Sequence, residues 1–317
     1  MPTTTGPRLI AGNANRPLAE AIARHLNLAL DPATISTFSD GEVRVQLHQN
    51  VRGADVFVVQ PTSAPVNHHL MELLIVMDAL RRSSVGRITA VLPYFGYARQ
   101  EKRTVGREPI SAKLVANLIT VAGAHRVLTL DLTARAIEGF FDIPVDHLRA
   151  GPIQAHYLQQ QLLGSQCTIV APDEGAVDRA SRFQARFGGG SNFAIVLKHR
   201  PTPDVTEVRG MIGDVAGRVC ILVDDIISTG GTLIHAAELL LEHGAREVYA
   251  AVTHAVLAPD APQRLQESAL AGVIVTDTIN IPPDKRFPKL TVLSVAPLLA
   301  EAIDRIHNDQ SVSELFY

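Results

Sequence analysis

Residues 219–232 carry the side chains whose types and order point most directly to chemistry. The segment reads VCILVDDIISTGGT: an apolar run, the adjacent acids Asp224 and Asp225, and then small residues. An Asp-Asp pair after a strand is by itself more often a turn than a site. The small residues that follow favour a site, because they leave room for a phosphate group to approach the backbone.

The residues that follow this loop predict a helix. Apolar side chains recur there at helical spacing, at Leu233, Ile234, Ala237, Leu240 and Leu241. At a strand–loop–helix junction the loop amides and the first helical amides point outward together, which favours an anion. The two acids just before them suit hydrogen bonds from sugar hydroxyls or a hydrated metal ion.

Alternating elements along the chain predict how this junction is positioned. Short β-branched runs at 55–59, 87–92 and 126–130 alternate with helical patterns at 66–80 and 111–121. The alternation resumes with helices at 151–163 and 175–187 and strands at 168–171 and 193–197. Such alternation is typical of parallel strands joined by helical crossovers.

The same order of strands and helices is therefore predicted twice, and a weak similarity between two segments supports an internal duplication. RVLTLD at 126–131 and RVCILVD at 218–224 both end a β-rich run in an acid. The prediction is an α/β protein of two duplicated domains with parallel sheets flanked by helices, divided into residues 1–148 and 149–317. Prolines and alternating polarity at 198–210 predict a projecting hairpin in the second domain.

Composition excludes several classes of partner. The 317 residues have a formal charge of −3, no tryptophan and 5% aromatics, so neither a basic field nor stacking side chains favour nucleic acid. No apolar stretch reaches the ~18 residues of a membrane span, and residues 1–6 do not resemble a secretion signal. Cys167 and Cys220 lie in apolar runs and are expected to be reduced core thiols. The prediction is a cytoplasmic protein without membrane or nucleic-acid partners.

Residues 219–232 resemble the ribose-phosphate-binding motif of the type I phosphoribosyltransferase fold, which narrows the substrate to a phosphorylated ribose. The wider chain resembles one branch of that fold, the ribose-phosphate pyrophosphokinases. The matching segments, in the family's order, are FSDGEV (38–43), PVNHHLMELLIVMDALRRSS (65–84), PYFGYARQ (93–100), REPISAK (107–113), GFFDIPVDHL (139–148), APDEGA (171–176) and SVSELF (311–316).

The resemblance implies an activity and its partners. The enzyme would transfer the β,γ-diphosphate of ATP to the C1 hydroxyl of ribose 5-phosphate, giving 5-phosphoribosyl 1-diphosphate and AMP for nucleotide biosynthesis. ATP would be a substrate, Mg²⁺ the cofactor, and the assembly a homo-hexamer built from dimers. Without the resemblance, the same segments would be interpreted as an Asp-Gly turn, a solvated basic loop and ordinary surface charges.

The resemblance also implies roles for individual residues. Lys198 and Arg200 would be catalytic, at the base of the hairpin, and residues 101–107 would form a flexible lid. ATP would contact Arg99 and Gln100 and, from a neighbouring subunit, Phe38, Asp40, Gly41 and Glu42. Ribose 5-phosphate would contact Arg200, Asp224, Asp225, Ser228, Thr229, Gly230, Gly231 and Thr232. Asp173 would hold magnesium, and an effector site would comprise Arg52, Ser311, Ser313 and Phe316.

Two positions depart from the family's pattern. Thr133 stands where the family has a histidine beside the ATP-bound metal, and a hydroxyl is a poorer metal ligand than imidazole. Ser228 stands where many members carry an aspartate, and serine still caps such a loop. Thr133 leaves open a non-catalytic regulatory relative of the synthetase. A nucleobase phosphoribosyltransferase is a further alternative, disfavoured by the PYFGYARQ segment.

Overall fold

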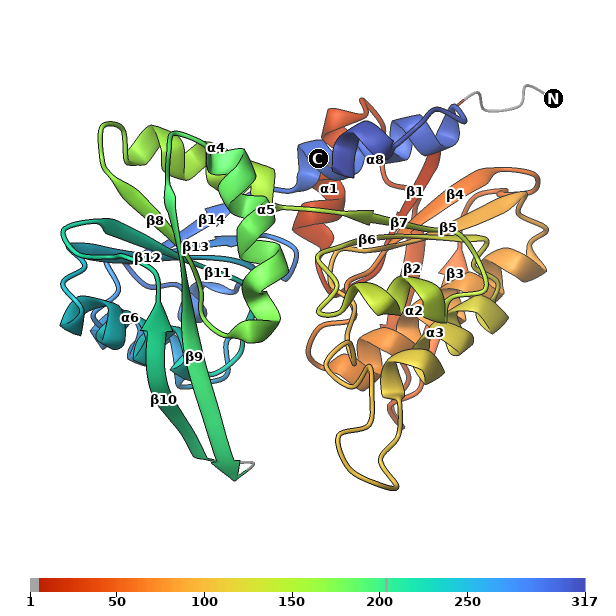
Figure 1. The fold of residues 1–317 in the computed structure, drawn as a ribbon. Coiled ribbons are helices and arrows are strands. Elements are labelled where there is room, and N and C mark those ends of the chain that lie inside the picture. The colour runs from red at the N-terminus through yellow and green to blue at the C-terminus, as the bar shows by residue number, and fades with distance from the viewer. Residues whose placement is uncertain (1–5, 203–204, 317) are drawn as a thin grey trace. The chain divides into compact units, whose positions relative to one another are not determined.

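A computed structural model describes residues 6–202 and 205–316, with the side chains of 198–202, 205–209 and 316 outside the described part. The chain forms two compact units, which are treated separately (Figure 1). Unit 1 comprises Met1–Arg149, Thr278–Asn280 and Ser294–Tyr317, and unit 2 comprises Ala150–Asp277 and Ile281–Leu293. Each unit has its own buried apolar core around a sheet.

A five-stranded parallel sheet with the order β1-β4-β5-β6-β7 forms the centre of unit 1. Its strands are β1 (Arg8–Ala11), β4 (Asp55–Val59), β5 (Arg87–Leu92), β6 (Arg126–Leu130) and β7 (Val145–Leu148). The helices around it are α1 (Arg16–His25), α2 (Val66–Arg82) and α3 (Ser111–Ala122), with a 3-10 turn η1 (Arg135–Phe140). The central strands are buried almost throughout, as expected for a sheet covered by crossover helices.

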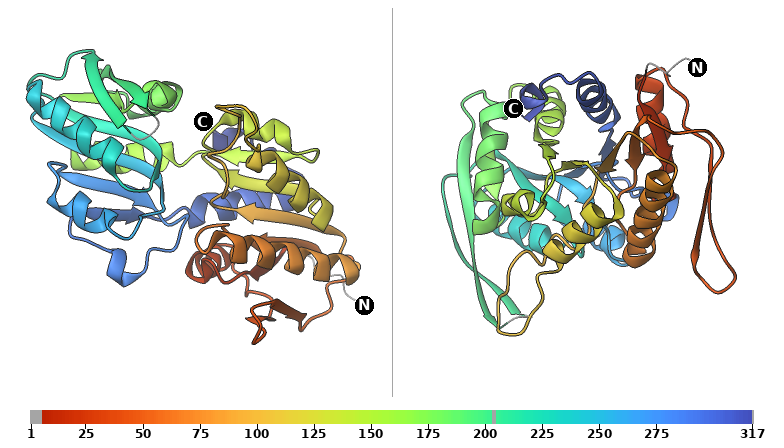
Figure 2. Two further views of the ribbon diagram at one scale, coloured as in Figure 1. Left: turned by 90° about the horizontal axis from the view of Figure 1, so that it is seen from below. Right: turned by 90° about the vertical axis from the view of Figure 1, so that its right-hand side faces the viewer.

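A separate hairpin stands between α1 and β4 in unit 1. Its strands β2 (Ala33–Thr37) and β3 (Val43–Leu47) pair antiparallel, and Figure 2 shows the hairpin, in red, projecting from the unit. Alternate side chains, Ala33, Ile35, Val45 and Leu47, pack against the core while those between them are exposed.

Unit 2 has a seven-stranded sheet with the order β10-β9-β8-β11-β12-β13-β14. All neighbours are parallel except the β9–β10 hairpin. The strands are β8 (Cys167–Ala171), β9 (Asn192–Thr202), β10 (Val205–Ile212), β11 (Val219–Ile227), β12 (Glu247–Ala255), β13 (Gly272–Thr276) and β14 (Leu290–Leu293). The helical elements are α4 (Gly151–Gln161), η2 (Glu174–Ala176), α5 (Val177–Phe187), α6 (Gly231–Glu242), α7 (Ala261–Glu267) and η3 (Pro283–Lys285).

The two units repeat one plan, and the predicted α/β fold class is confirmed. From β1 to β7, and again from β8 to β14, the elements follow one order: strand, helix, hairpin, strand, helix, strand, helix, strand, strand. The helix that follows the last strand of each repeat belongs to the other unit. Helix α4 follows β7 but packs on α5, and α8 (Ala296–His307) follows β14 but packs on α1 (Figure 1).

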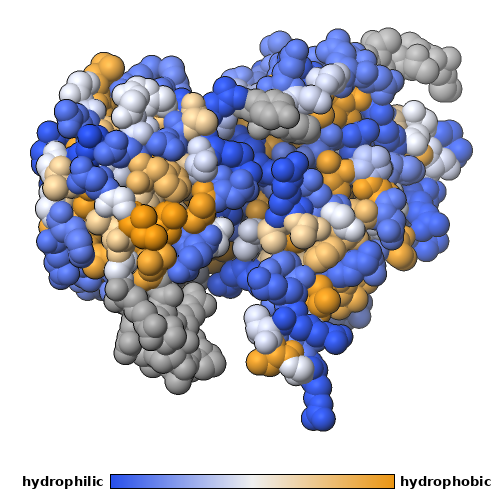
Figure 3. Space-filling model, viewed as in Figure 1, coloured by the Kyte–Doolittle hydropathy of each residue, from blue (hydrophilic) through white to orange (hydrophobic). Residues whose placement is uncertain are grey.

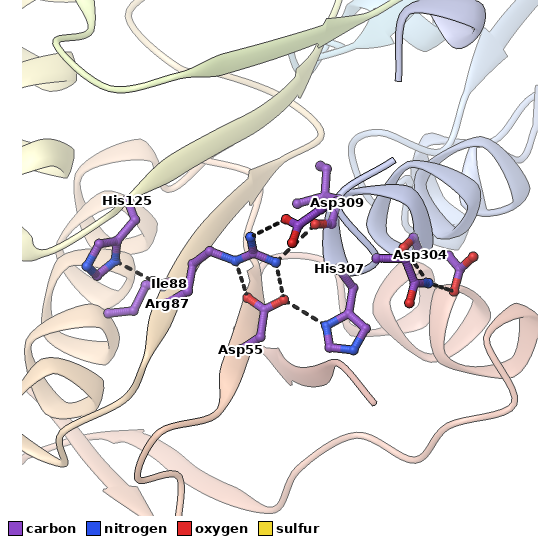
Figure 4. Close-up of polar contacts among 9 residues, drawn as sticks. Asp55, Arg87, Ile88, His125, Asp304, His307 and Asp309 are labelled. Atoms are coloured by element: carbon purple, nitrogen blue, oxygen red, sulfur yellow. Dashed lines mark hydrogen bonds and ion pairs between the residues drawn. The ribbon is translucent and has the colours of Figure 1, made fainter. Parts of the chain in front are cut away.

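Charged groups hold the carboxyl end of α8 to the amino edge of the unit 1 sheet (Figure 4). Arg87 donates from Nε and Nη2 to the two carboxylate oxygens of Asp55, at 2.8 and 2.6 Å, and from Nη2 to the Ile306 carbonyl at 3.0 Å. His307 Nδ1 lies 2.8 Å from Asp55 Oδ2, and Arg87 Nη1 lies 3.3 Å from Asp309 Oδ1. Asp55 raises the pKa of Arg87, so this guanidinium stays charged.

Both cysteines are free and buried, as predicted. Cys167 packs on one face of the unit 2 sheet and Cys220 on the other, so the two thiols do not face each other. Burial raises the pKa of Cys167 and raises that of Cys220 to about 12, which disfavours the reactive thiolate. Within the described ranges, no helix is long and apolar enough to cross a membrane.

A buried carboxylate, Glu72 on α2, holds together the carboxyl ends of β1 and β4 in unit 1. Its Oε1 accepts from Asn13 N and Gln60 Nε2, both at 2.7 Å, and its Oε2 accepts from Asn13 Nδ2 at 2.8 Å. Gln60 in turn accepts from Ala14 N at 3.1 Å. Glu72 therefore accepts from both Asn13 donors and orients Gln60, and so helps to fix the loop between β1 and α1.

Glu72→Ala is expected to destabilise the protein by about 3–5 kcal/mol, because buried donors lose their charged acceptor. Chemical denaturation followed by circular dichroism measures this. The matched control is Glu20→Ala on α1, whose carboxylate makes only an exposed pair with Arg16 and is worth about 0.5 kcal/mol or less. Equal effects of the two substitutions would contradict the structural role of Glu72.

Candidate functional site

Two acids lie in strand β11 just before its last two residues, Ile226 and Ile227, at the carboxyl edge of the unit 2 sheet. Asp225 is buried and Asp224 is partly exposed, and Asp225 N donates to Asp224 Oδ1 at 2.9 Å. Arg179 on α5 lies between them, with Nη1 3.3 Å from Asp224 Oδ1 and 3.4 Å from Asp225 Oδ1. One guanidinium therefore faces two carboxylates, and the site keeps an excess of negative charge.

The environment of Asp224 disfavours its ionised form. Burial raises the pKa of this carboxyl to about 8, and the charges of Asp225 and Asp173 act in the same direction. Arg179 acts in the opposite direction and does not compensate for them. The pair is thus arranged to take up a proton or to interact with another cation or hydrogen-bond donor.

The loop after the acids leads directly into the start of α6. Gly230 has a φ of 77°, and a Cβ there would lie 3.0 Å from Leu265 Cδ2, so glycine is required on both counts. The first N–H groups of α6, which begins at Gly231, have no acceptor within the helix. Ser228, Thr229, Gly231 and Thr232 are all at least partly exposed beside it. The predicted anion site therefore has the local geometry that the sequence indicated.

Asp173 lies at the end of β8, the strand next to β11. Its Oδ1 accepts from Ala176 N at 3.2 Å, which caps the 3-10 turn η2. The negative charge of Asp173 helps to raise the pKa of Asp224. Unit 2 therefore brings together Asp173, Asp224 and Asp225 along one edge of its sheet. Carboxylate oxygens are the donors that magnesium prefers. Among the described residues, no group of three or more His, Cys, Asp or Glu side chains has metal-binding geometry.

The predicted ATP residues of the PYFGYARQ segment follow β5 at the carboxyl edge of the unit 1 sheet. Tyr94 and Phe95 are buried while Arg99 and Gln100 are exposed, so the segment anchors by its aromatics and presents its polar end. Gly96 packs so closely on Thr62 that a Cβ would lie 2.4 Å from its carbonyl oxygen. Ser111 Oγ donates to Gln100 Oε1 at 2.5 Å, which fixes the start of α3.

Thr133 also lies at this edge, just after β6. The preceding residue, Leu132, donates its N–H to His147 Nε2 at 2.8 Å, and His147 Nδ1 lies 2.5 Å from Glu138 Oε1. His147 thus supports the turn that carries Thr133. Thr133 itself is partly exposed.

The FSDGE residues form the tip of the β2–β3 hairpin, and all of them are exposed. Phe38 N donates to Glu42 O at 2.7 Å and Glu42 N to Asp40 Oδ1 at 3.2 Å, closing a tight turn with Gly41 at φ 98°. The Arg44 guanidinium lies over the Phe38 ring, with 5.8 Å from its carbon to the ring centroid. Within the unit this aromatic side chain remains largely open to solvent.

The basic loop 101–107 is shaped by Glu108. Its Oε2 accepts from Thr104 N, Thr104 Oγ1 and Val105 N at 2.7, 2.8 and 3.1 Å. These bonds, above all that from Thr104 N, lower the pKa of Glu108, so its carboxylate is charged at neutral pH. One carboxylate therefore closes the loop predicted to be a lid.

Glu108→Ala is expected to speed tryptic cleavage after Lys102, Arg103 and Arg107 by roughly 5- to 10-fold at pH 8, because an opened loop fits a protease more readily. Mass spectrometry of timed digests measures this. Glu108→Gln keeps an acceptor oxygen without the charge and should be cleaved at an intermediate rate. Cleavage of all three proteins at one rate would show that Glu108 does not hold the loop.

The remaining predicted residues lie as follows. Lys198 and Arg200 belong to strand β9, and their side chains are outside the described residues. Arg52 lies in an exposed turn before β4, and Ser311 and Ser313 are exposed near the 3-10 turn η4 (Ser313–Phe316). Arg305 holds this tail by donating to Ser311 O at 3.0 Å and Glu314 Oε2 at 2.9 Å. The Phe316 side chain is outside the described part.

Sequence reasoning missed Arg179, the cation of the acid pair. It stands in the pattern AVDRAS, which has no sequence signal beyond the charge itself. Its partners are about 45 residues further along the chain, so only the packing of α5 against β11 reveals the contact.

Comparisons with known proteins agree with this geometry. Residues 7–123 match the family model for the N-terminal domain of ribose phosphate pyrophosphokinase, and residues 194–317 match the phosphoribosyl synthetase-associated domain. The chain is 53% identical to a ribose-phosphate pyrophosphokinase of Caldanaerobacter subterraneus, over 99% of this chain and 98% of the relative. It is 52% identical to one of Gloeobacter violaceus, over 98% and 92%.

A solved structure supports the same assignment. The phosphoribosylpyrophosphate synthetase of Mycobacterium smegmatis superimposes with a TM-score of 0.91 at 46% identity, covering 96% of this chain and 99% of that one. The similarity spans both units and therefore both halves of the duplicated plan. The chain belongs to the ribose-phosphate pyrophosphokinase family and has that family's activity.

Proposed function

We propose that this chain transfers the β,γ-diphosphate of ATP to the C1 hydroxyl of ribose 5-phosphate, giving 5-phosphoribosyl 1-diphosphate and AMP. The observation that carries the proposal is the β11–α6 junction, where Asp224 and Asp225 precede an open run of backbone amides. The amides suit the 5-phosphate, and the carboxylates suit the ribose hydroxyls. The ribose phosphate would be held at its two polar ends.

Charge in the transition state explains the need for Lys198 and Arg200. The C1 oxygen attacks the β-phosphorus, the bond from that phosphorus to the α,β-bridging oxygen breaks, and AMP leaves. Negative charge grows on the nonbridging oxygens and on AMP, and positioned cations lower this barrier. Strand β9 pairs parallel with β8 as far as Ala171 and Ile195, so the later residues of β9, Lys198 and Arg200 among them, continue past the end of β8 that precedes Asp173, which favours a catalytic role for these two basic residues.

The donor set at the sheet edge fits magnesium. Burial raises the pKa of Asp224, and the charges of Asp225 and Asp173 act in the same direction, so a divalent cation there would favour the ionised carboxylates. Asp173 would hold the ion together with waters and substrate oxygens, and Thr133 would act only through its hydroxyl or a bridging water. When bound, magnesium supplies electrostatic stabilisation of the phosphate oxygens.

ATP would be bound by Arg99 and Gln100 and by the FSDGE tip of a neighbouring subunit, in a homo-hexamer. Two observations favour association. Phe38 is exposed at the end of a projecting hairpin. Helix α3 and the residue before it also present exposed apolar side chains at helical spacing: Ile110, Leu114, Leu118 and Val121. Figure 3 shows apolar surface on unit 1. Arg52, Ser311, Ser313 and Phe316 would bind a phosphate or ADP effector, in a cytoplasmic enzyme.

Phosphorus NMR of the purified protein with ATP, magnesium and ribose 5-phosphate tests the reaction. AMP and a C1 diphosphate ester in equal amounts, formed without any nucleobase, support the proposal. A Thr133→His variant is the matched control for the one departure in the metal region. Product from the variant alone, with ligand binding in both proteins, would instead identify a regulatory relative of the synthetase.

A further inference from the structure

We propose that Arg264 on α7 is a positioning residue of the ribose-phosphate loop. It would orient the peptide group between Thr229 and Gly230 and place a positive charge beside the bound 5-phosphate. The proposal rests on the proposed function, since it concerns the same loop. Arg264 lies 32 residues beyond the loop's end at Thr232 and belongs to none of the segments that identify the site.

The guanidinium of Arg264 lies directly against the loop. Its Nη1 donates to the Thr229 carbonyl oxygen at 3.1 Å. Its Nη2 lies 3.7 Å from the position that a Cβ on Gly231 would occupy. The nearest acid, Asp260, has its Oδ2 3.8 Å from Nη1, and the Arg264 side chain remains 41% exposed. The charge is therefore next to the loop and accessible from solvent.

The bond to Thr229 has a consequence for the next amide. In a trans peptide the carbonyl and the following N–H point in opposite directions. Arg264 takes the Thr229 carbonyl on one side, so the Gly230 N–H is directed to the other. Among the described hydrogen bonds none is donated by Thr229 N or Gly230 N, which keeps both amides available to an anion.

The carbonyls on either side are held as well. The Ser228 oxygen accepts from Ala258 N at 2.9 Å, and the Gly230 oxygen accepts from Ile234 N at 3.0 Å. Three consecutive carbonyls are thus bonded to groups outside the anion site. Arg264 supplies the middle one, which is the only one of the three held by a side chain.

The same helix supports the loop from below. Leu265 is fully buried and would lie 3.0 Å from a Cβ on Gly230, so it touches the loop at its left-handed residue. Two neighbouring residues of α7 therefore hold the loop: Leu265 through an apolar contact and Arg264 through a charged hydrogen bond. A loop held in its binding conformation loses less conformational entropy when the phosphate binds.

The position of Arg264 beside the 5-phosphate loop predicts which kinetic constant its substitution changes. The 5-phosphate is remote from C1, where the bond forms, so its contacts are the same in the ground state and the transition state. Removing such a contact raises KM and leaves kcat unchanged. Arg264→Met should raise KM for ribose 5-phosphate about 10-fold, the value of one charge-assisted hydrogen bond, with KM for ATP unchanged.

Two variants separate charge from geometry and from general damage. Arg264→Lys keeps the charge without the planar fork and should recover part of the loss. Arg246→Met removes one charge from the same unit at the amino end of β12, where the exposed Arg246 donates from Nη2 to Ser165 Oγ at 3.1 Å. Its KM for ribose 5-phosphate should match that of the unaltered protein.

Calorimetric binding of ribose 5-phosphate without ATP, steady-state kinetics and Tm are measured for these variants and for Thr232→Ala, which removes a loop hydroxyl. Weaker binding in both Arg264→Met and Thr232→Ala, with kcat and Tm retained, supports the proposal. Weaker binding in Thr232→Ala alone, or equal losses in Arg264→Met and Arg246→Met, overturns the role of Arg264. Unchanged binding in every variant would overturn the loop as the ribose-phosphate site.

Discussion

Lys198→Ala is expected to lower kcat by roughly 10³-fold or more, since a cation acting on transferring phosphoryl oxygens contributes at least this much to many such reactions. Ribose 5-phosphate binding and the fold should be largely retained, because Lys198 lies on β9 and the proposed phosphate loop follows β11. Coupled assay of AMP release measures kcat, and calorimetry measures binding.

A lysine outside the site provides the control for Lys198. Lys289 also belongs to unit 2, and its Nζ donates to the Ser268 carbonyl at 2.7 Å. Lys289→Ala removes the same charge and the same length of side chain as Lys198→Ala. It should change stability and leave kcat unchanged. If turnover is unchanged in Lys198→Ala, this residue has no part in the mechanism, and the activity must depend on Arg200 and the metal.

The sequence was sufficient to predict the strands that are buried on both faces. Strands β4, β5 and β6 have the predicted bounds, because a strand covered on both faces is a continuous apolar run with polar residues at each end. Helix α5 begins at Val177, two residues later than predicted, because Asp173 caps a 3-10 turn at Glu174–Ala176. Periodicity does not distinguish a 3-10 turn from the first turn of an α-helix.

Contacts between distant segments were beyond prediction from one sequence. Arg179 and Arg264 each contact a predicted functional segment, yet each is a single charged residue in an otherwise ordinary helical pattern. The exchange of α4 and α8 between the units was also not predicted, since an apolar face does not show which sheet it covers. The motifs predicted the groups that would contact substrate, whereas the groups that position these segments became visible only in the fold.

Asp224→Asn is expected to change stability and activity in opposite directions. Burial and neighbouring acids raise the pKa of Asp224 to about 8, whereas an unfolded aspartate titrates at its ordinary value of 3.8. The folded protein keeps this proton where the unfolded chain releases it. The contribution of Asp224 to the free energy of unfolding is therefore complete below pH 3.8 and is lost as the pH rises to about 8.

The asparagine variant should therefore lose less stability than the unaltered protein between pH 5 and pH 8, by on the order of a few kcal/mol at pH 8. Urea denaturation at several pH values measures this difference. Asp178→Asn, an exposed acid on α5 paired with Arg182, is the matched control and should leave the pH profile unchanged. A variant that is less stable at pH 8 would show that Arg179 stabilises ionised Asp224 and that the pKa is not raised.

In the same variant, kcat/KM for ribose 5-phosphate should fall roughly 10²-fold, because a buried polar site discriminates strongly when a hydrogen-bond acceptor is lost. The two results have one cause. The burial and neighbouring acids that disfavour ionised Asp224 would be offset by the ribose hydroxyls and a divalent cation, which favour the ionised carboxylate. Unchanged kcat/KM, together with the flattened stability profile, would make the acid pair a structural feature and move the sugar contacts to Asp225 or to the loop.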